Sequence, residues 1–172
     1  MNALRGFIGS KEREQTVWTP EFILDAVDKV FPDGWADRFP SEGSPATLRA
    51  SPKVIVPCAD ALETTPWPDR CFANPPYKEL KLHLPRAAYE WGQFDVQTVL
   101  LIPIRTLRVW WCGAVRGATV AYLKSLAFID SRTGAPYPGA FPENLAAVYW
   151  GDRRATFMDA FADLSTHMQE HF

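Results

Sequence analysis

The tightest constraint on the fold is a short apolar segment that breaks into a rigid polar turn, Cys71-Phe72-Ala73-Asn74-Pro75-Pro76-Tyr77. Each proline has a fixed φ angle and no backbone N–H, so a strand that includes Ala73 must end there. The main-chain carbonyls of Asn74 and Pro75 are then held pointing outward. The turn therefore offers two acceptors, the Asn74 side-chain oxygen and the Pro75 carbonyl, and the Tyr77 ring lies where it can stack on a flat ligand.

Two fixed acceptors suit an exocyclic amino group. In adenine or cytosine the nitrogen of this group is a poor nucleophile, because its lone pair is delocalised into the ring. Acceptors that hold both amino hydrogens favour the pyramidal nitrogen that forms during attack on an electrophilic methyl group. The alternative is an ordinary loop between a strand and a helix, because Asn, Pro and Tyr are common in turns.

The composition predicts one globular domain over residues 1–172, since the chain is 47% hydrophobic and 13% aromatic. A net charge of −2 argues against nonspecific coating of nucleic acid, although seven Lys or Arg oppose three acids from Lys78 to Lys124. The three dispersed cysteines indicate neither a disulfide framework nor a metal site. No leader or membrane-length apolar run is evident, so we expect a soluble cytoplasmic protein.

The first ordered element is predicted to be an amphipathic helix that follows a loose arm, residues 1–15. Thr19 is a good N-cap and Pro20 fits the first helical position. Apolar residues then recur at helical spacing up to Phe31, and Pro32-Asp33-Gly34 ends the run.

Two acids follow predicted strands in the next part of the chain. Asp37 lies in the short possible strand Trp35–Phe39, before a small-residue loop that contains Gly43. Open α/β sheets bind nucleotides just after such strands, although an ordinary turn has the same pattern. Asp60 follows a second strand, Val54–Val56, and can accept a hydrogen bond from a ribose or an adenine amino group, or else cap a helix.

Further along, a helix is predicted over Leu80–Trp91, partly interrupted by Pro85 and ended by Gly92. The run Val96–Ile104 is continuous and rich in β-branched residues, which indicates a buried central strand.

The segment after this strand combines guanidinium groups with indoles, a pattern that can grip phosphates and stack on bases. With the exposed turn, it supplies four candidate nucleic-acid contacts: Lys78, Arg105, Arg108 and Trp110. The alternative is a helix with Val109, Trp110 and Ala114 as its buried stripe, and Trp111 is expected in the core in either case.

The C-terminal third is predicted to hold two more strands, Val120–Ile129 and Leu145–Trp150, as an antiparallel pair across the loop 134–142. A closing amphipathic helix is predicted over Arg154–Met168.

Together these features resemble the phage-type DNA N6-adenine methyltransferases, which are related to the Dam enzymes. The resemblance covers roughly Trp18–Trp150 and is strongest at the Asn-Pro-Pro-Tyr turn. Further landmarks are Trp18-Thr19-Pro20, Leu101-Ile102-Pro103 with Arg105, Thr106 and Trp110 behind it, and Phe141-Pro142 to Tyr149. It implies a Rossmann-like S-adenosylmethionine-dependent α/β fold: a mostly parallel sheet with an antiparallel C-terminal strand pair and flanking helices.

The resemblance also implies roles for individual residues. Asn74, Pro75, Pro76 and Tyr77 would hold an adenine flipped out of double-stranded DNA. The residues that would lie against the cofactor are Trp18, Thr19, Pro20, Asp37, Phe39, Gly43 and, for its adenosine part, Asp60. The chain departs from the family pattern at Arg38, which replaces a proline, in its single loop glycine, and at Ser125, which replaces an arginine.

Several alternatives stay open. The amino acceptor can instead be cytosine N4, an RNA base or a glutamine amide. A non-catalytic nucleic-acid-binding module that keeps the fold is a different class of function. Recognition of a DNA target can also require a partner chain or a homodimer, and a phage-encoded enzyme would work in the host cytoplasm.

Overall fold

The computed structural model describes residues 17–50, 62–63 and 66–172. Its helices are α1 (Glu21–Val30), α2 (Pro45–Arg49), α3 (Leu80–Phe94), α4 (Val109–Ala114) and α5 (Arg154–Phe161), with 3₁₀ turns η3 (Tyr77–Glu79) and η4 (Ala162–Leu164). Its strands are β1 (Val17–Trp18), β2 (Ala36–Asp37), β3 (Arg70–Ala73), β4 (Gln97–Pro103), β5 (Thr119–Leu123), β6 (Ile129–Asp130), β7 (Leu145–Trp150) and β8 (Ser165–Glu170). The predicted arm, the Val54–Val56 strand and Asp60 lie outside the described residues.

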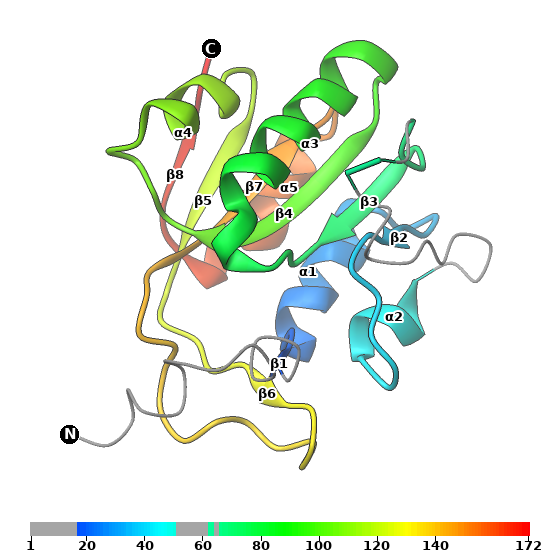
Figure 1. The fold of residues 1–172 in the computed structure, drawn as a ribbon, viewed down its shortest axis with the longest axis vertical. Helices are drawn as coiled ribbons and strands as arrows, with labels where there is room; N and C mark the ends of the chain where they lie inside the picture. The colour runs from blue at the N-terminus through cyan, green and yellow to red at the C-terminus, as the bar shows by residue number, and fades with distance from the viewer. Residues whose placement is uncertain (1–16, 51–61, 64–65) are drawn as a thin grey trace.

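The main sheet has the strand order β2-β3-β4-β7-β5-β8, and β1 pairs with β6 in a separate two-stranded ladder (Figure 1). β2, β3 and β4 run parallel, whereas β4–β7, β7–β5 and β5–β8 are antiparallel. The α/β class and the antiparallel β5–β7 pair are as predicted. Among the described strands, however, the expectation of a mostly parallel sheet is wrong, because β7 returns between β4 and β5 and β8 adds an antiparallel edge.

Two apolar layers cover the sheet. One contains α1 and α5, whose residues pack with Val99 and Leu101 of β4, and the other contains α3 and α4, which pack with Leu100 and Ile102. Figure 1 shows α3 in front of the sheet and α5 behind it. Alternate β4 side chains thus enter opposite layers, which is why the central strand is continuously apolar.

The helices differ from the prediction at their ends. Pro20 is the N-cap of α1 and Glu21 its first residue, so the predicted Thr19 cap is wrong. α3 continues through Pro85 and Gly92 to Phe94. Lys81, whose carbonyl loses its helical partner at Pro85, is exposed to water, which can replace that bond.

The C-terminal third contains the largest corrections. The predicted Val120–Ile129 strand is two strands: β5 ends at Leu123, and β6 leaves the main sheet to pair with β1. The predicted Arg154–Met168 helix ends at Phe161, after the two phenylalanines of its buried face. The 3₁₀ turn η4 follows, and then β8, a half-exposed edge strand that pairs with β5 and carries few apolar residues.

Candidate active site at the carboxyl edge of the parallel strands

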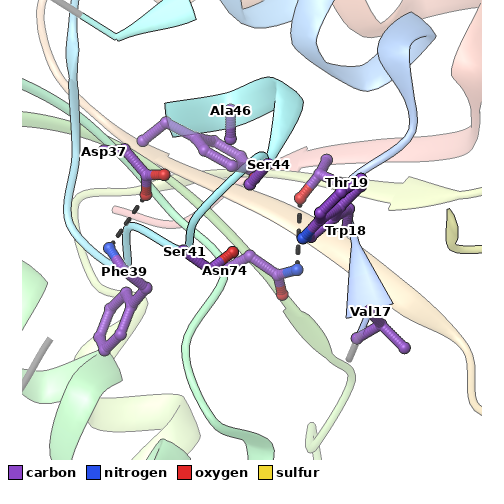
Figure 2. Close-up of a pocket in the computed structure, with 10 residues that line it drawn as sticks. Val17, Trp18, Thr19, Asp37, Phe39, Ser41, Ser44, Ala46 and Asn74 are labelled. Atoms are coloured by element: carbon purple, nitrogen blue, oxygen red, sulfur yellow. Dashed lines mark hydrogen bonds between the residues drawn. The ribbon is translucent and has the colours of Figure 1, made fainter. Parts of the chain in front are cut away.

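Asn74 lies at the carboxyl end of β3, where the two prolines stop the strand as predicted. Its side-chain Nδ2 donates a hydrogen bond of 3.3 Å to Thr19 Oγ1, a buried hydroxyl just before α1. Figure 2 shows the amide oxygen turned away from Thr19. No described residue donates a hydrogen bond to this oxygen or to the Pro75 carbonyl.

Asn74 lines a small cavity of about 40 Å³ at this edge of the sheet (Figure 2). Five of the predicted site residues meet there: Trp18, Thr19, Asp37, Phe39 and Asn74. The cavity walls also contain residues that the motifs did not single out: Val17, Ser41, Ser44, Ala46 and Phe72. Of these, Ser41 and Ser44 lie in the loop before α2 and Ala46 lies in its first turn, and the run of small side chains there was the available signal.

Hydrogen bonds centred on Asp37 hold the start of that loop in place. Its side chain is 3% exposed, and Oδ1 accepts a 2.9 Å hydrogen bond from the Phe39 N–H. The Thr47 hydroxyl donates to Oδ2 at 2.9 Å and accepts from the Ser41 N–H at 3.0 Å. Burial raises the pKa of Asp37, and the bonds from Phe39 and Thr47 oppose this rise only in part.

Trp18 closes the cavity from the side of β1. Its indole lies against Gly43, where an added Cβ would be 3.3 Å from Cη2 of the ring. Gly43 also has a positive φ of 73°, which a residue with a side chain adopts only with strain. The backbone conformation and the close approach of the Trp18 ring therefore both favour glycine at this position, although Gly43 does not itself line the cavity.

Tyr77 does not line the cavity. Its ring contacts Phe141 and Phe128, with centroid distances of 5.7 and 6.4 Å. The hydroxyl is buried without a hydrogen-bond partner among the described residues, and burial raises its pKa. In this structure the Tyr77 ring thus packs against the rings of Phe128 and Phe141. Pro75, two residues earlier in the chain, is buried as well.

The candidate nucleic-acid contacts lie outside the cavity, in the segments that follow β3 and β4: Lys78 in η3, Arg105 and Arg108 in the loop after β4, and Trp110 in α4. Arg105 is half-buried and forms an ion pair with Glu143 at 2.5 Å, whereas Arg108 and Lys78 are exposed. Trp110 packs against Trp111, which is buried as expected. The alternative of a helix with a buried stripe is correct for α4 and for the buried Ala114 but wrong for Val109, which is 90% exposed.

Arg38, one of the residues that depart from the pattern of the resemblance, is fully buried but does not line the cavity. Its guanidinium carbon lies 5.0 Å from the centre of the Trp67 ring, a cation–π contact. Its three guanidinium nitrogens have no hydrogen-bond partner among the described residues, and burial lowers its pKa. Arg38 itself therefore contributes no side chain to the cavity lining.

No protein-family model, curated protein or solved structure matches this chain. Across the part of the chain that the structure describes, no cluster of three or more His, Cys, Asp or Glu side chains is placed to hold a metal ion. Within the same residues, no helix is both long and apolar enough to cross a bilayer. Function is accordingly inferred from the residues of the cavity.

Proposed function

We propose that this protein transfers a methyl group from S-adenosylmethionine to the N6 amino group of adenine in double-stranded DNA. The observation that carries the proposal is the meeting of Asn74 and Asp37 in one cavity, with the Asn74 amide oxygen unpaired among the described residues. The resemblance assigns these two residues to the base and to the cofactor, respectively. A methyltransferase must hold the target amine and the donor methyl group close enough to react, so the base site and the cofactor site must adjoin.

Asn74 and Pro75 would act by accepting the two amino hydrogens. The hydrogen bond to Thr19 fixes the amide plane, so Oδ1 is oriented before the base arrives. Preset acceptors stabilise positive charge as it develops on the attacking nitrogen, without a strong base. When bound, S-adenosylmethionine supplies the electrophilic methyl group on its sulfonium, so the chain needs only to align and desolvate the two partners.

A Rossmann-like methyltransferase fold is part of the same proposal. In support, β2, β3 and β4 are parallel and present their carboxyl ends to the edge where the cavity lies. Open α/β sheets bind their ligands at that edge. The antiparallel β5–β7 pair also agrees with the arrangement that the resemblance implies.

The cavity residues suit the amino-acid end of S-adenosylmethionine, which carries a positively charged ammonium group, better than they suit a neutral ligand. The Asp37 carboxylate is buried beside the cavity, and Gly43 leaves room for the Trp18 ring. The cavity itself holds about 40 Å³, whereas ligand pockets commonly hold ~300 Å³ or more. We therefore expect Trp18 or the loop 38–44 to move outward when the cofactor enters.

Cofactor affinity is expected to fall at acid pH. The raised pKa of Asp37 means that its carboxyl takes up a proton at a higher pH than an ordinary aspartate does, and the neutral form loses its attraction for the cofactor ammonium. Below about pH 7 that ammonium stays charged. Calorimetry from pH 7 downward should show affinity falling ~10-fold or more as Asp37 is neutralised.

The matched variant is Asp37→Asn, which keeps the shape and an acceptor for the Phe39 N–H. It should bind the cofactor weakly at every pH and lose this pH dependence. Wild-type affinity in Asp37→Asn would remove Asp37 from the cofactor site.

The small cavity also supports a second candidate, a nucleic-acid-binding module that keeps the fold without the cofactor. Calorimetry separates the two functions: no heat at millimolar S-adenosylmethionine, together with retained DNA binding, would favour the module. Transfer to cytosine N4, an RNA base or a glutamine amide would use the same acceptors, and identification of the methylated product distinguishes these acceptors from adenine.

Arg108→Ala is expected to weaken DNA binding in a salt-dependent way. The exposed guanidinium lies beyond the carboxyl end of β4, where it can reach phosphate. Losing one phosphate contact lowers the slope of log affinity against log salt by about 1. The control is Arg116→Ala, an exposed arginine before β5 at the opposite edge of the sheet. Equal slopes for both variants would show that Arg108 does not contact phosphate.

A further inference from the structure

The loop between β4 and α4, residues 104–108, carries an unusual apolar tip. Leu107 is 97% exposed and Val109 is 90% exposed, with the exposed Arg108 between them. Figure 1 shows this loop projecting from the body of the molecule. A single exposed leucine is common, but two nearly fully exposed aliphatic side chains at one loop tip leave apolar surface without an internal partner.

The loop leaves the same edge of the sheet as the candidate active site. β3 and β4 are parallel, and Ala73 pairs with Leu100. Asn74 and the residues after Pro103 therefore emerge in the same direction, a few residues apart along the strand axis. A duplex that presents a base to Asn74 would lie across this edge.

Local contacts hold the tip in shape. The Arg108 N–H donates to the Arg105 carbonyl at 2.8 Å, which closes a turn around Leu107. The Arg105 side chain is tied to Glu143, just before β7. The Ile104 N–H donates to the Asn144 carbonyl at 2.9 Å. Leu107 is thus presented by an anchored turn, and less conformational entropy is lost when it binds.

We propose that Leu107 is a wedge that enters the base stack of double-stranded DNA beside the extruded adenine. This inference rests on the proposed function. Extruding a base costs stacking energy, and proteins that open a stack insert an apolar side chain such as leucine. The aromatic candidates at this edge are engaged elsewhere, because Tyr77 packs on Phe141 and Trp110 packs on Trp111.

Charge favours DNA over a protein as the occupant. Leu107 is followed directly by the exposed Arg108, whereas the charge of Arg105 is paired with Glu143. An unneutralised cation next to an apolar side chain matches a base stack that lies beside a phosphate backbone. Two aliphatic side chains alone are far too small for a stable protein interface.

The test is binding to duplex DNA that contains one abasic site, measured by fluorescence anisotropy without cofactor. An abasic site removes the cost of extrusion, so the wild-type protein should bind it ~10-fold or more tightly than the intact duplex. Leu107→Ala should bind both duplexes within about twofold of each other, and Leu107→Met should keep the preference. The matched control is Leu48→Ala, an exposed leucine on α2, which should behave as wild type.

The proposal is overturned if the wild-type protein shows no preference, or if Leu107→Ala keeps it. A methylation assay adds a second readout, on intact and heat-denatured genomic DNA. Leu107→Ala should lose activity ~10-fold or more on duplex DNA but keep it within about threefold on single strands, which need no extrusion. A protein that shows the abasic preference but no methylation contradicts the transferase alone, because the binding assay requires no turnover.

Discussion

Asn74→Ala is expected to lower methyl transfer to DNA by ~100-fold or more while cofactor affinity stays within about threefold of wild type. The alanine removes one of the two acceptors that hold the target amine, and removal of a single preset stabilising group in other enzymes has an effect of this size. Thr19 loses its hydrogen bond from Nδ2 but stays in place, because it is buried at the start of α1.

The measurement is incorporation of labelled methyl groups into DNA, with cofactor affinity followed by calorimetry. Asn144→Ala is the matched control: the same chemical change at an exposed asparagine before β7, whose contact with Ile104 uses only its main chain. Wild-type turnover by Asn74→Ala would remove Asn74 from the mechanism.

Phe157→Ala is expected to lower the free energy of unfolding by ~3–5 kcal/mol. Phe157 is fully buried on the inner face of α5. Its ring stacks on Tyr149 with a centroid distance of 5.0 Å and lies 4.7 Å from Phe161. The alanine leaves a cavity between α5 and the sheet, in the layer that also contains α1.

Urea unfolding followed by tryptophan fluorescence or circular dichroism measures this loss. The control is the next residue, Met158→Ala, at a position that is 38% exposed, where a change below about 1 kcal/mol is expected. Equal losses for the two variants would contradict the packing of α5. Because α1 begins just after Thr19, a weakened α1–α5 layer should also loosen the cavity.

The elements that the sequence predicted well are those with strong local signals. The prolines after Ala73 end β3 whatever surrounds them, and the run from Val99 to Ile102 reads as a buried strand because it enters two layers. β8 was missed because its one apolar residue, Met168, also fits a helical spacing, and only the pairing of β8 with β5 makes it a strand. The break after Leu123 likewise depends on β1, which lies about a hundred residues earlier in the chain.

The candidate site likewise combines features that the sequence predicts locally with features that depend on contacts between distant segments. Asp37 and Asn74 were identified from local motifs and Thr19 from the resemblance, and the structure brings the three into one cavity. The closure of that cavity by Trp18 against Gly43 depends on a contact between distant segments. The covering of Tyr77 by Phe128 and Phe141 is long-range as well, and no motif around Tyr77 contains it.

The central claim is that the Asn74 turn holds an adenine amino group beside a methyl donor. The most direct test is incubation of the purified protein with mixed-sequence duplex DNA and methyl-labelled S-adenosylmethionine, followed by digestion to nucleosides and mass spectrometry. We predict labelled N6-methyladenine with the wild-type protein and none above background with Asn74→Ala. Wild-type protein that binds the DNA but yields no methylated nucleoside would contradict the claim.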